Sequence, residues 1–432
     1  MSVFSLHGGL LAMDQRSLNR SCLLHLCQTL LRYSLHPYGS NEGYPVQNLL
    51  ISLQLLLRHL NIFRFQYSLL LDFFLLTSLW GQINVAHQKD IVSGEVWKDT
   101  DGNVINAHGG GILFNNGKYY WFGEHRPSSG FTTQVGVTCY SSTDLRNWKY
   151  EGVALAVSDE AGSDIEKGCI IERPKVIYNQ KTGKYVMWFH LELKGRGYGP
   201  SRAGVAVSDT PAGPYRFIRS GRVNPGVYPL NMTREEQKLT WNPEDYEWWT
   251  PEWREAVNKG MFVKRDLEGD GQMSRDMTLF VDDDGTAYHI YSSEENLTLH
   301  IAELSDDYLS HTGKYIRIFP GGHNEAPAIF KKDGTYWMIA SGCTGWEPNE
   351  ARLMTASSIL GEWSQLPNPC VGKDAKITFG GQSTYILPLK DGGYMFMADV
   401  WRPKSLSDSR YIWLPVRFNG KGIPFIEWVD KW

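Results

Sequence analysis

A single motif occurs five times between residues 110 and 400, and it constrains the fold more than any other feature of the chain. Each copy has an apolar run, a polar turn that contains glycine, and a second apolar run rich in aromatic residues. This order is typical of a β-hairpin. The copies are GGILFNNGKYYWFGEH (110–125), PKVIYNQKTGKYVMWFH (174–190), TLFVDDDGTAYHIYSS (278–293), AIFKKDGTYWMIASG (328–342) and YILPLKDGGYMFMADV (385–400).

Shorter turn signals follow four of these hairpins, at residues 141–148, 208–215, 304–309 and 357–363. We expect these turns to connect the outer strands of each repeat, with a large apolar side chain packed between sheets. Repeats of roughly fifty to seventy residues, built from short strands without amphipathic helices between them, indicate radial repetition. The sequence therefore predicts an all-β fold, a five-bladed β-propeller that spans residues 88–432.

The segment 219–272 interrupts this regularity between the second and third repeats. We interpret it as an insertion that is partly helical around residues 251–259. Four tryptophans lie within it: Trp241, Trp248, Trp249 and Trp253. Two roles are open for them, because large aromatic side chains can either pack the insertion onto a blade or form a wall of a substrate cleft.

Residues 1–87 differ in kind from the rest, because they are rich in leucine and the first lysine of the chain is Lys89. The apolar run 67–80 is too short and too interrupted for a membrane span, but it resembles the core of a secretory signal. We expect a secreted, periplasmic or cell-surface protein whose mature chain begins near residues 82–88 and is not stably inserted in a membrane. On this interpretation residues before about 60 are an over-extended reading frame or an unusual leader, and the alternative is a helical anchor.

Composition excludes one class of function and suggests another. The formal net charge of −4 offers no basic surface for nucleic acid. Aromatic residues make up 13% of the chain and sixteen are tryptophans, which gives many flat surfaces for stacking. The six cysteines lack the spacing of a zinc site, so we expect buried thiols, with one disulfide possible.

The residues at the start of each innermost strand face the central channel of such a propeller. Read from the five repeats, they are His108 and Glu124, Glu172, Asp276, Glu325 and Gln382. Acidic groups from four blades would therefore meet near one axis. Like charges held close together raise the pKa of at least one carboxyl, and a protonated carboxyl is what general-acid cleavage of a glycosidic bond requires.

The stretches NAHGGGILFNNGKYYWFGEH, ERPKVIYNQKTGKYVMWFH, RDMTLFVDDDGTAYHIY and NEAPAIFKKDGTYWMIAS resemble glycoside hydrolase family 43. The resemblance covers residues 100–430 and implies a five-bladed propeller that cleaves plant polysaccharides with inversion. It also implies that Glu325 is the general acid, and that Asp276 orients Glu325 and tunes its pKa.

The first repeat departs from the family pattern, because Gly109 follows His108 where most members carry the aspartate that acts as base. This departure, together with FGEHR, ERPKV and GGQST, resembles the exo-β-1,3-galactanase branch. The resemblance implies that Gln382 takes the base position as an imidic acid. It further implies a galactose pocket lined by these residues: His108, Glu124, Glu172, Tyr198, Asn296 and Thr344.

Some of these assignments have plain structural alternatives. Glu124 could instead form a surface salt bridge with its neighbours His125 and Arg126. Tyr198, Asn296 and Thr344 are of residue types that also occur often in loops, where they need have no role in binding.

We therefore expect a monomeric, inverting, exo-acting glycoside hydrolase that releases galactose from the β-1,3-galactan backbone of arabinogalactan. Glu325 would protonate the leaving oxygen, and Gln382, or failing that Glu172 or Glu124, would position the water. The alternatives are an α-L-arabinofuranosidase or β-xylosidase of the same family, and a carbohydrate-binding propeller without activity.

No cofactor is expected to be required. The segments 266–272 and 282–285 do not extend into a calcium-binding loop, and the second fits a hairpin turn. The sequence leaves open the possibility that a single calcium ion binds on the propeller axis, near His108 or His289.

Overall fold

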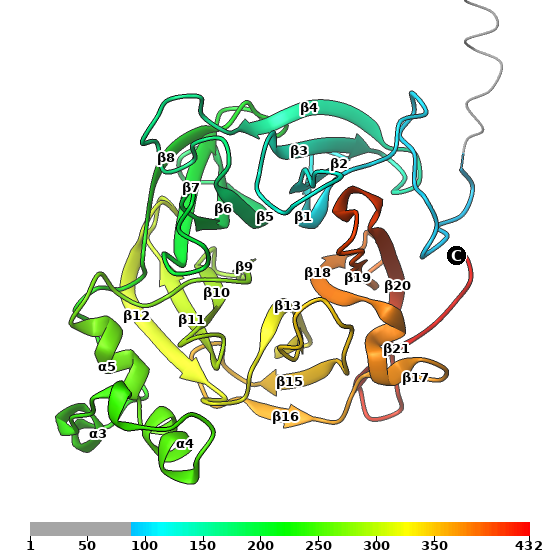
Figure 1. Ribbon diagram of the computed structural model, residues 1–432. Coiled ribbons are helices and arrows are strands. Elements are labelled where there is room, and N and C mark those ends of the chain that lie inside the picture. Colours follow the sequence, from blue (N-terminus) through cyan, green and yellow to red (C-terminus); the bar gives the residue numbers. More distant parts are fainter. Residues whose placement is uncertain (1–87) are drawn as a thin grey trace, which may run out of the picture. The chain divides into compact units, whose positions relative to one another are not determined.

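The computed structural model describes residues 88–432, and the predicted leader, residues 1–87, lies outside the described residues. Five antiparallel sheets surround a central axis (Figure 1), as the repeats predict. The innermost strands contact one another in a closed ring, in the order β1, β5, β9, β13 and β18. The all-β, five-bladed propeller is therefore confirmed.

The first two blades are meanders that run outward from the axis. Blade one consists of β1 (His108–Asn115), β2 (Lys118–Glu124), β3 (Gly136–Ser142) and β4 (Lys149–Ala156). Blade two consists of β5 (Ile170–Asn179), β6 (Lys184–Glu192), β7 (Arg202–Ser208) and β8 (Arg216–Gly221).

The other three blades follow the same plan. Blade three consists of β9 (Met277–Val281), β10 (Ala287–Ser293), β11 (Thr298–Leu304) and β12 (His311–Ile318). Blade four consists of β13 (Glu325–Lys332), β14 (Thr335–Ser341), β15 (Arg352–Ala356) and β16 (Ser364–Leu366). Blade five consists of β18 (Gln382–Pro388), β19 (Tyr394–Val400), β20 (Arg410–Phe418) and β21 (Pro424–Glu427), with β17 (Cys370–Val371) parallel to β21.

The predicted hairpins and outer turns are all present as connections between these strands. In the first hairpin, Asn116 and Gly117 have positive φ angles of 48° and 82°. In the fourth, Asp333 and Gly334 have φ angles of 49° and 77°. Two-residue turns with positive φ match the twist of the flanking strands, which is why the Asn-Gly and Asp-Gly pairs mark them in the sequence.

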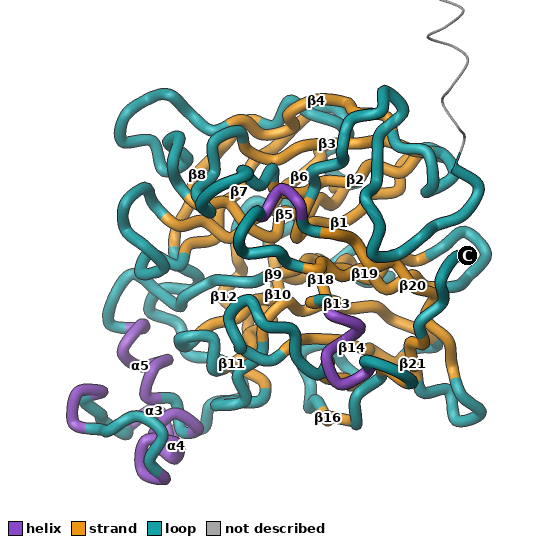
Figure 2. Tube along the Cα trace, turned by 45° about the vertical axis from the view of Figure 1, so that its right-hand side comes forward, coloured by secondary structure: helices purple, strands orange, loops and turns teal. Residues whose placement is uncertain are grey.

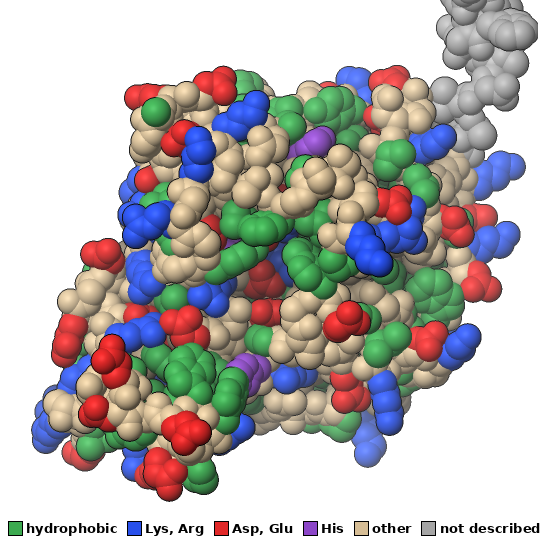
Figure 3. Space-filling model, in the orientation of Figure 1, with side chains coloured by type: hydrophobic (Ala, Val, Ile, Leu, Met, Phe, Trp, Pro, Cys, Tyr) green, Lys and Arg blue, Asp and Glu red, His purple; other side chains and the backbone are tan. Residues whose placement is uncertain are grey.

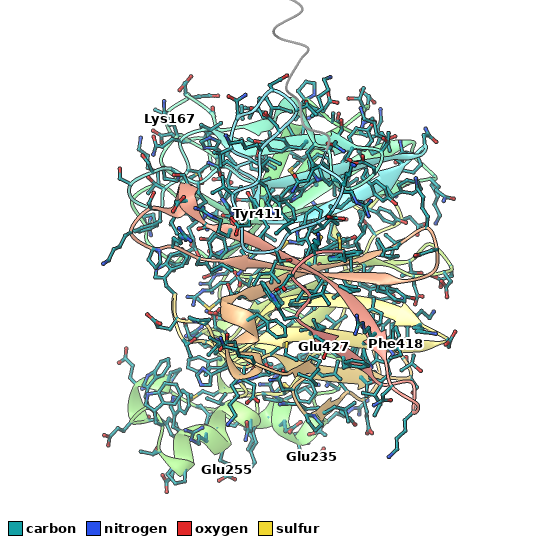
Figure 4. All side chains as sticks on the ribbon, turned by 90° about the vertical axis from the view of Figure 1, so that its right-hand side faces the viewer. Lys167, Glu235, Glu255, Tyr411, Phe418 and Glu427 are labelled. Atoms are coloured by element: carbon teal, nitrogen blue, oxygen red, sulfur yellow. The ribbon has the colours of Figure 1, made fainter. Side chains whose placement is uncertain are left out.

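The hydrophobic core is divided into clusters that lie between neighbouring blades. Between blades five and one, Trp121, Trp148 and Trp413 pack together with the buried Tyr411, which is labelled in Figure 4. Each blade thus buries its two faces only against its neighbours. The ring is also tied at its ends, because the backbone groups of Ile91 and Trp432 exchange hydrogen bonds of 2.8 and 3.2 Å.

The insertion between β8 and β9 contains all three α-helices that the structure describes, and Figure 2 shows them grouped together. Its helices are α3 (Arg234–Lys238), α4 (Pro251–Asn258) and α5 (Met261–Leu267), with a short 3-10 turn at η1 (Pro243–Asp245). Two further 3-10 turns lie in the fifth blade, at η2 (Ala375–Gly380) and η3 (Leu406–Asp408). Trp253 is buried in a small core of the insertion that includes Leu297 of the propeller. The predicted helical insertion is therefore confirmed.

A buried ion pair fastens the insertion to blade three. Arg317 Nη2 lies 2.6 Å from Glu294 Oε2. The same guanidinium donates to the backbone carbonyls of Val257 and Asn258, each at 2.9 Å. These carbonyls belong to the last turn of α4, where a positive charge is favourable.

The four cysteines that the structure describes are free: Cys139, Cys169, Cys343 and Cys370. Three of them are buried, as small apolar side chains usually are. Within residues 88–432, no helix combines the length and the apolar character that crossing a membrane requires.

Replacing Arg317 with methionine should leave the buried Glu294 carboxylate without its arginine partner, and should remove the hydrogen bonds to the carbonyls at the end of α4. We expect the free energy of unfolding to fall by about 3–5 kcal/mol. Urea denaturation of Arg317→Met would measure this loss. Arg417→Met is the matched control, since the exposed Arg417–Glu427 pair should contribute less than about 1 kcal/mol. Equal effects of the two substitutions would contradict the assignment.

Candidate active site

A pocket of about 450 Å³ opens at the propeller axis, and every blade contributes to its lining. Its side chains are Arg126, Phe131, Glu172, Arg173, His190, Tyr198, Arg275, Asp276, Asn296, Glu325, Trp346, Gln382 and Trp401, with Gly345. Figure 3 shows charged side chains gathered in the central hollow. Glu172, Tyr198, Asp276, Asn296, Glu325 and Gln382 were predicted from the sequence, and the structure brings them together here.

A repeated β-bulge aims the axial side chains into the channel. The register between the first two strands shifts after His108, Glu172 and Glu325. The next residue in each case has a positive φ, at 60° for Gly109, 54° for Arg173 and 52° for Ala326. A bulge of this kind bends the strand and redirects the side chain beside it.

Glu325 has the environment of a proton donor. Its Oε1 accepts a hydrogen bond of 2.8 Å from Asn296 Nδ2, and its Oε2 lies 3.5 Å from Gln382 Nε2. Burial, with a smaller contribution from the negative charge of Asp276, raises the pKa of Glu325 to about 7. A carboxyl with this pKa holds its proton near neutral pH, which general-acid catalysis requires.

Arg173 connects Asp276 to Gln382. Its Nη2 lies 2.8 Å from Asp276 Oδ2 and 2.6 Å from Gln382 Oε1. Gln382 Oε1 also accepts a hydrogen bond of 2.8 Å from Trp401 Nε1. Arg173 and Trp401 can only donate hydrogen bonds, so Oε1 of Gln382 must accept from both. These contacts therefore favour the ordinary amide form of Gln382 in the free protein, in which Oε1 carries no proton.

Glu172 is the most strongly paired carboxylate of the pocket. It accepts hydrogen bonds from Arg126 Nη2 at 2.8 Å and Tyr198 Oη at 3.0 Å, and His190 Nδ1 lies 3.1 Å from its second oxygen. Burial opposes the charge, but the hydrogen bond from His190 and the charge of Arg126 hold the pKa of Glu172 well below its usual range. Glu172 is therefore ionised.

His190 lies between two carboxylates. Its Nε2 is 2.9 Å from Glu192 Oε1, on the side away from Glu172. Burial favours the neutral ring, but the hydrogen bonds to Glu172 and Glu192 outweigh burial and raise the pKa of His190 to about 9. The ring is therefore cationic at neutral pH.

Three residues predicted to contact the sugar do not line the pocket. His108 is buried, with Nδ1 3.1 Å from Asp399 Oδ1 and its ring stacked on Tyr411. Thr344 lies in a loop that turns it away from the pocket, and its hydroxyl donates to Glu347 O and accepts from Asn349 Nδ2. Glu124 lies beneath the pocket floor, 2.7 Å from Arg126 Nη2. The salt bridge with Arg126 considered for Glu124 is therefore present, but it is buried rather than at the surface.

The carboxyl group of Glu124 fills the space that an aspartate side chain at position 109 would need. A Cβ atom placed on Gly109 would lie only 2.2 Å from Glu124 Oε1. Burial, opposed by the charge of Arg126, raises the pKa of Glu124 to about 8. Glu124 therefore replaces the missing side chain sterically, but it holds a proton at neutral pH.

The pocket does not suit the axial calcium ion left open by the sequence. Glu172, His190 and Asp276 could place ligand atoms within 4.8 Å of one another. However, Arg126 and Arg173 already lie 2.8 Å from the two carboxylates, and His190 is cationic. A divalent cation would have to displace these charges. His289 is remote from this site, because it packs between Trp188 and His311.

Four pocket side chains that contact Glu172, Asp276 or Gln382 were missed by considering only the starts of the inner strands: Arg126, Arg173, His190 and Trp401. The hairpin register could have found His190, because it pairs directly with Glu172 across the two strands. Arg126 and Arg173 lie within the FGEHR and ERPKV stretches, but their direction depends on the loop and the bulge.

The comparisons with known proteins agree with this geometry. The family model for glycosyl hydrolases family 43 matches residues 250–402. A solved family 43 β-1,3-galactosidase with galactodeoxynojirimycin is 80% identical, with a TM-score of 0.78, and the match covers 79% of this chain and 99% of that one. An exo-β-1,3-galactanase from Clostridium thermocellum is 37% identical, with a TM-score of 0.65 and coverage of 79% and 66%.

A curated β-D-galactofuranosidase from Aspergillus niger is 31% identical over 121 residues, which are 27% of this chain. The match spans 35% of that relative's length. The fold and the pocket define a five-bladed propeller with a carboxylate-lined axial site. The chain belongs to glycoside hydrolase family 43, as the sequence resemblance predicted.

Removing the charge of Asp276 should lower the pKa of Glu325, since that charge helps to raise it. Glu325 must be protonated to act as an acid, so activity should fall as the pH rises through about 7. In Asp276→Asn, this fall should move by about one pH unit to lower pH. The pH profile of kcat/KM measures it. Asp283→Asn, at an exposed turn of the same blade, is the control, and an unmoved profile in Asp276→Asn would contradict the coupling.

Proposed function

We propose that this protein is an inverting, exo-acting glycoside hydrolase that releases galactose from the end of β-1,3-galactan. The observation that carries the proposal is the buried Glu325, which keeps its proton near neutral pH in a pocket shared by all five blades. The similarity to a β-1,3-galactosidase and to exo-β-1,3-galactanases supports the choice of sugar and linkage.

In the proposed reaction, Glu325 donates its proton to the glycosidic oxygen while the bond between that oxygen and C1 of the terminal galactose breaks. Asn296 holds the carboxyl in place through its 2.8 Å hydrogen bond. The ionised Glu172 and the negative Asp276 lie in the same pocket and stabilise the positive charge that develops on the sugar ring.

A water molecule must then attack C1 from the opposite face, and we assign its placement to Gln382. Arg173 and Trp401 fix the amide oxygen, so the amide nitrogen points toward Ser341 and Glu325. Two groups could accept the proton of this water. One is Glu172; the other is Nε2 of Gln382 in its imidic form, in which an Nε2 proton has moved to Oε1 and Oε1 no longer accepts from both Arg173 and Trp401. Glu124 is the poorer candidate, because its raised pKa leaves it protonated.

The pocket also supports an exo mode of action. Its volume of about 450 Å³ suits a small ligand rather than a long chain. Arg126, Glu172 and Arg173 are buried and close its floor. A terminal galactose would therefore bind inside, with the remaining chain directed toward solvent.

We further propose that the protein acts outside the cytoplasm on plant arabinogalactan, as a monomer and without a metal ion. A polymeric substrate does not cross a membrane unaided, which agrees with the signal-like run at residues 67–80. The guanidinium groups of Arg126 and Arg173 supply positive charge where an axial cation would otherwise balance the carboxylates.

Glu325→Gln should abolish turnover and preserve binding, because glutamine keeps the shape of the side chain but has no proton to donate. We expect galactose release from β-1,3-galactobiose to fall by a factor of about 100 or more. Wild type should release little from p-nitrophenyl arabinofuranoside. Chromatography of the released sugar measures both, and Glu362→Gln, at an exposed outer turn, is the control.

Two outcomes would contradict the proposed function. Faster cleavage of the arabinofuranoside than of galactobiose would favour the commoner activity of the family. Equal binding of galactan by wild type and Glu325→Gln, with no sugar released by either, would indicate a binding protein.

Gln382→Ala should lower kcat by a factor of about 100, because the attacking water loses the group that positions it. Gln382→Glu should recover part of the loss, since a carboxylate can accept the proton directly. Steady-state kinetics on galactobiose tests both variants. An unchanged kcat in Gln382→Ala would instead assign the role to Glu172.

A further inference from the structure

Two tryptophans of the insertion stay at the surface, although burying an indole is favourable. Trp249 is 51% exposed and Trp248 is 45% exposed. Both rest on the buried Trp253, with ring centroids 5.0 Å apart in each case. We call the exposed pair, Trp248 and Trp249, the tryptophan platform. Figure 4 labels Glu235 and Glu255 at the outer edge of the same insertion.

The backbone of Trp249 is strained. Trp249 has a φ of 75° and is the third residue of a turn closed by a hydrogen bond from Thr250 N to Glu247 O. A positive φ at this position of a turn favours glycine or asparagine, and it is unfavourable for a bulky side chain. Strained residues of this kind concentrate at functional sites.

The platform is connected to the loop that leads to the general acid. The ring of Trp249 stacks on His323, with centroids 5.0 Å apart and an angle of 27° between the planes. His323 belongs to the loop between β12 and β13, two residues before Glu325. In Figure 3, hydrophobic side chains over the insertion lie on the face into which the central hollow opens.

A polar groove borders His323, the residue on which Trp249 stacks. Its volume is about 620 Å³, and its lining includes His323, Thr344, Asn349, Arg352 and Asn368. The loop that carries Thr344 continues into Gly345 and Trp346, which line the catalytic pocket on its other side. His323 therefore joins the platform to the groove, and residues 344–346 join the groove to the catalytic pocket.

The charge around the platform indicates which ligand suits it. Residues 234–258 include seven acidic and three basic side chains, so an anionic membrane surface would be repelled. A neutral sugar chain fits better. Its C–H faces can pack on indole rings, and its hydroxyl groups can donate to carboxylate and amide oxygens.

We propose that the tryptophan platform and the polar groove bind inner galactosyl residues of the β-1,3-galactan chain whose end occupies the catalytic pocket. The inference rests on the proposed function, because it takes the ligand from that function. Binding at the platform would hold the polymer on the enzyme after each terminal galactose is removed.

The test compares a long, debranched β-1,3-galactan with β-1,3-galactobiose, since only the polymer can occupy the pocket and the platform together. In Trp249→Ala, kcat/KM for the galactan should fall about tenfold, because the variant loses the stacking contact between the indole ring and one galactosyl residue. Turnover of galactobiose should change less than about twofold, and this also shows that the variant is folded. Leu230→Ala, at an exposed apolar position of the same insertion, is the control and should affect neither substrate.

Binding measured without turnover completes the test. In the Glu325→Gln background, Trp249→Ala should weaken galactan binding about tenfold by calorimetry. The platform is refuted if wild type cleaves both substrates and Trp249→Ala leaves the galactan values unchanged, or lowers both substrates equally. If wild type releases galactose from neither substrate, the proposed function fails, and the platform inference falls with it.

Discussion

Two buried guanidinium groups allow acidic side chains from several blades to share one axis. Arg126 lies within 2.8 Å of both Glu124 and Glu172, and Arg173 lies within 2.8 Å of Asp276. Without them, each buried carboxylate would carry a large desolvation penalty as well as the repulsion of the others. Burial, the arginines and His190 together set which carboxyls are ionised and which keep a proton, and the chemistry of the pocket depends on that division.

Much of the fold could be predicted because turns and strands follow from short local sequence patterns. Asn116-Gly117 and Asp333-Gly334 mark tight hairpin turns, and the repeated apolar runs on either side mark strands that need neighbouring blades to cover them. The insertion could be predicted because its sequence does not follow the repeat. It also carries a helix signal that begins at Thr250 and Pro251.

The site could be predicted only in part, because side-chain direction depends on geometry that a repeat does not encode. Glu172 and Glu325 were found from their position before an inner strand. Arg173 follows Glu172 directly, yet it reaches Asp276 and Gln382 only because a bulge gives it a φ of 54°. Thr344 was misplaced for the same reason, since its loop turns the hydroxyl toward Asn349 rather than the pocket.

The asymmetry of the pocket is its most informative feature. Glu325 faces an amide, Gln382, and the space of the expected aspartate at position 109 is filled by Glu124. The proposed mechanism has water attack C1 from the face opposite Glu325, with inversion. The most direct measurement is proton NMR of β-1,3-galactan during the first turnovers. The initial product should be α-galactose, and β-galactose as the initial product would contradict the proposed mechanism.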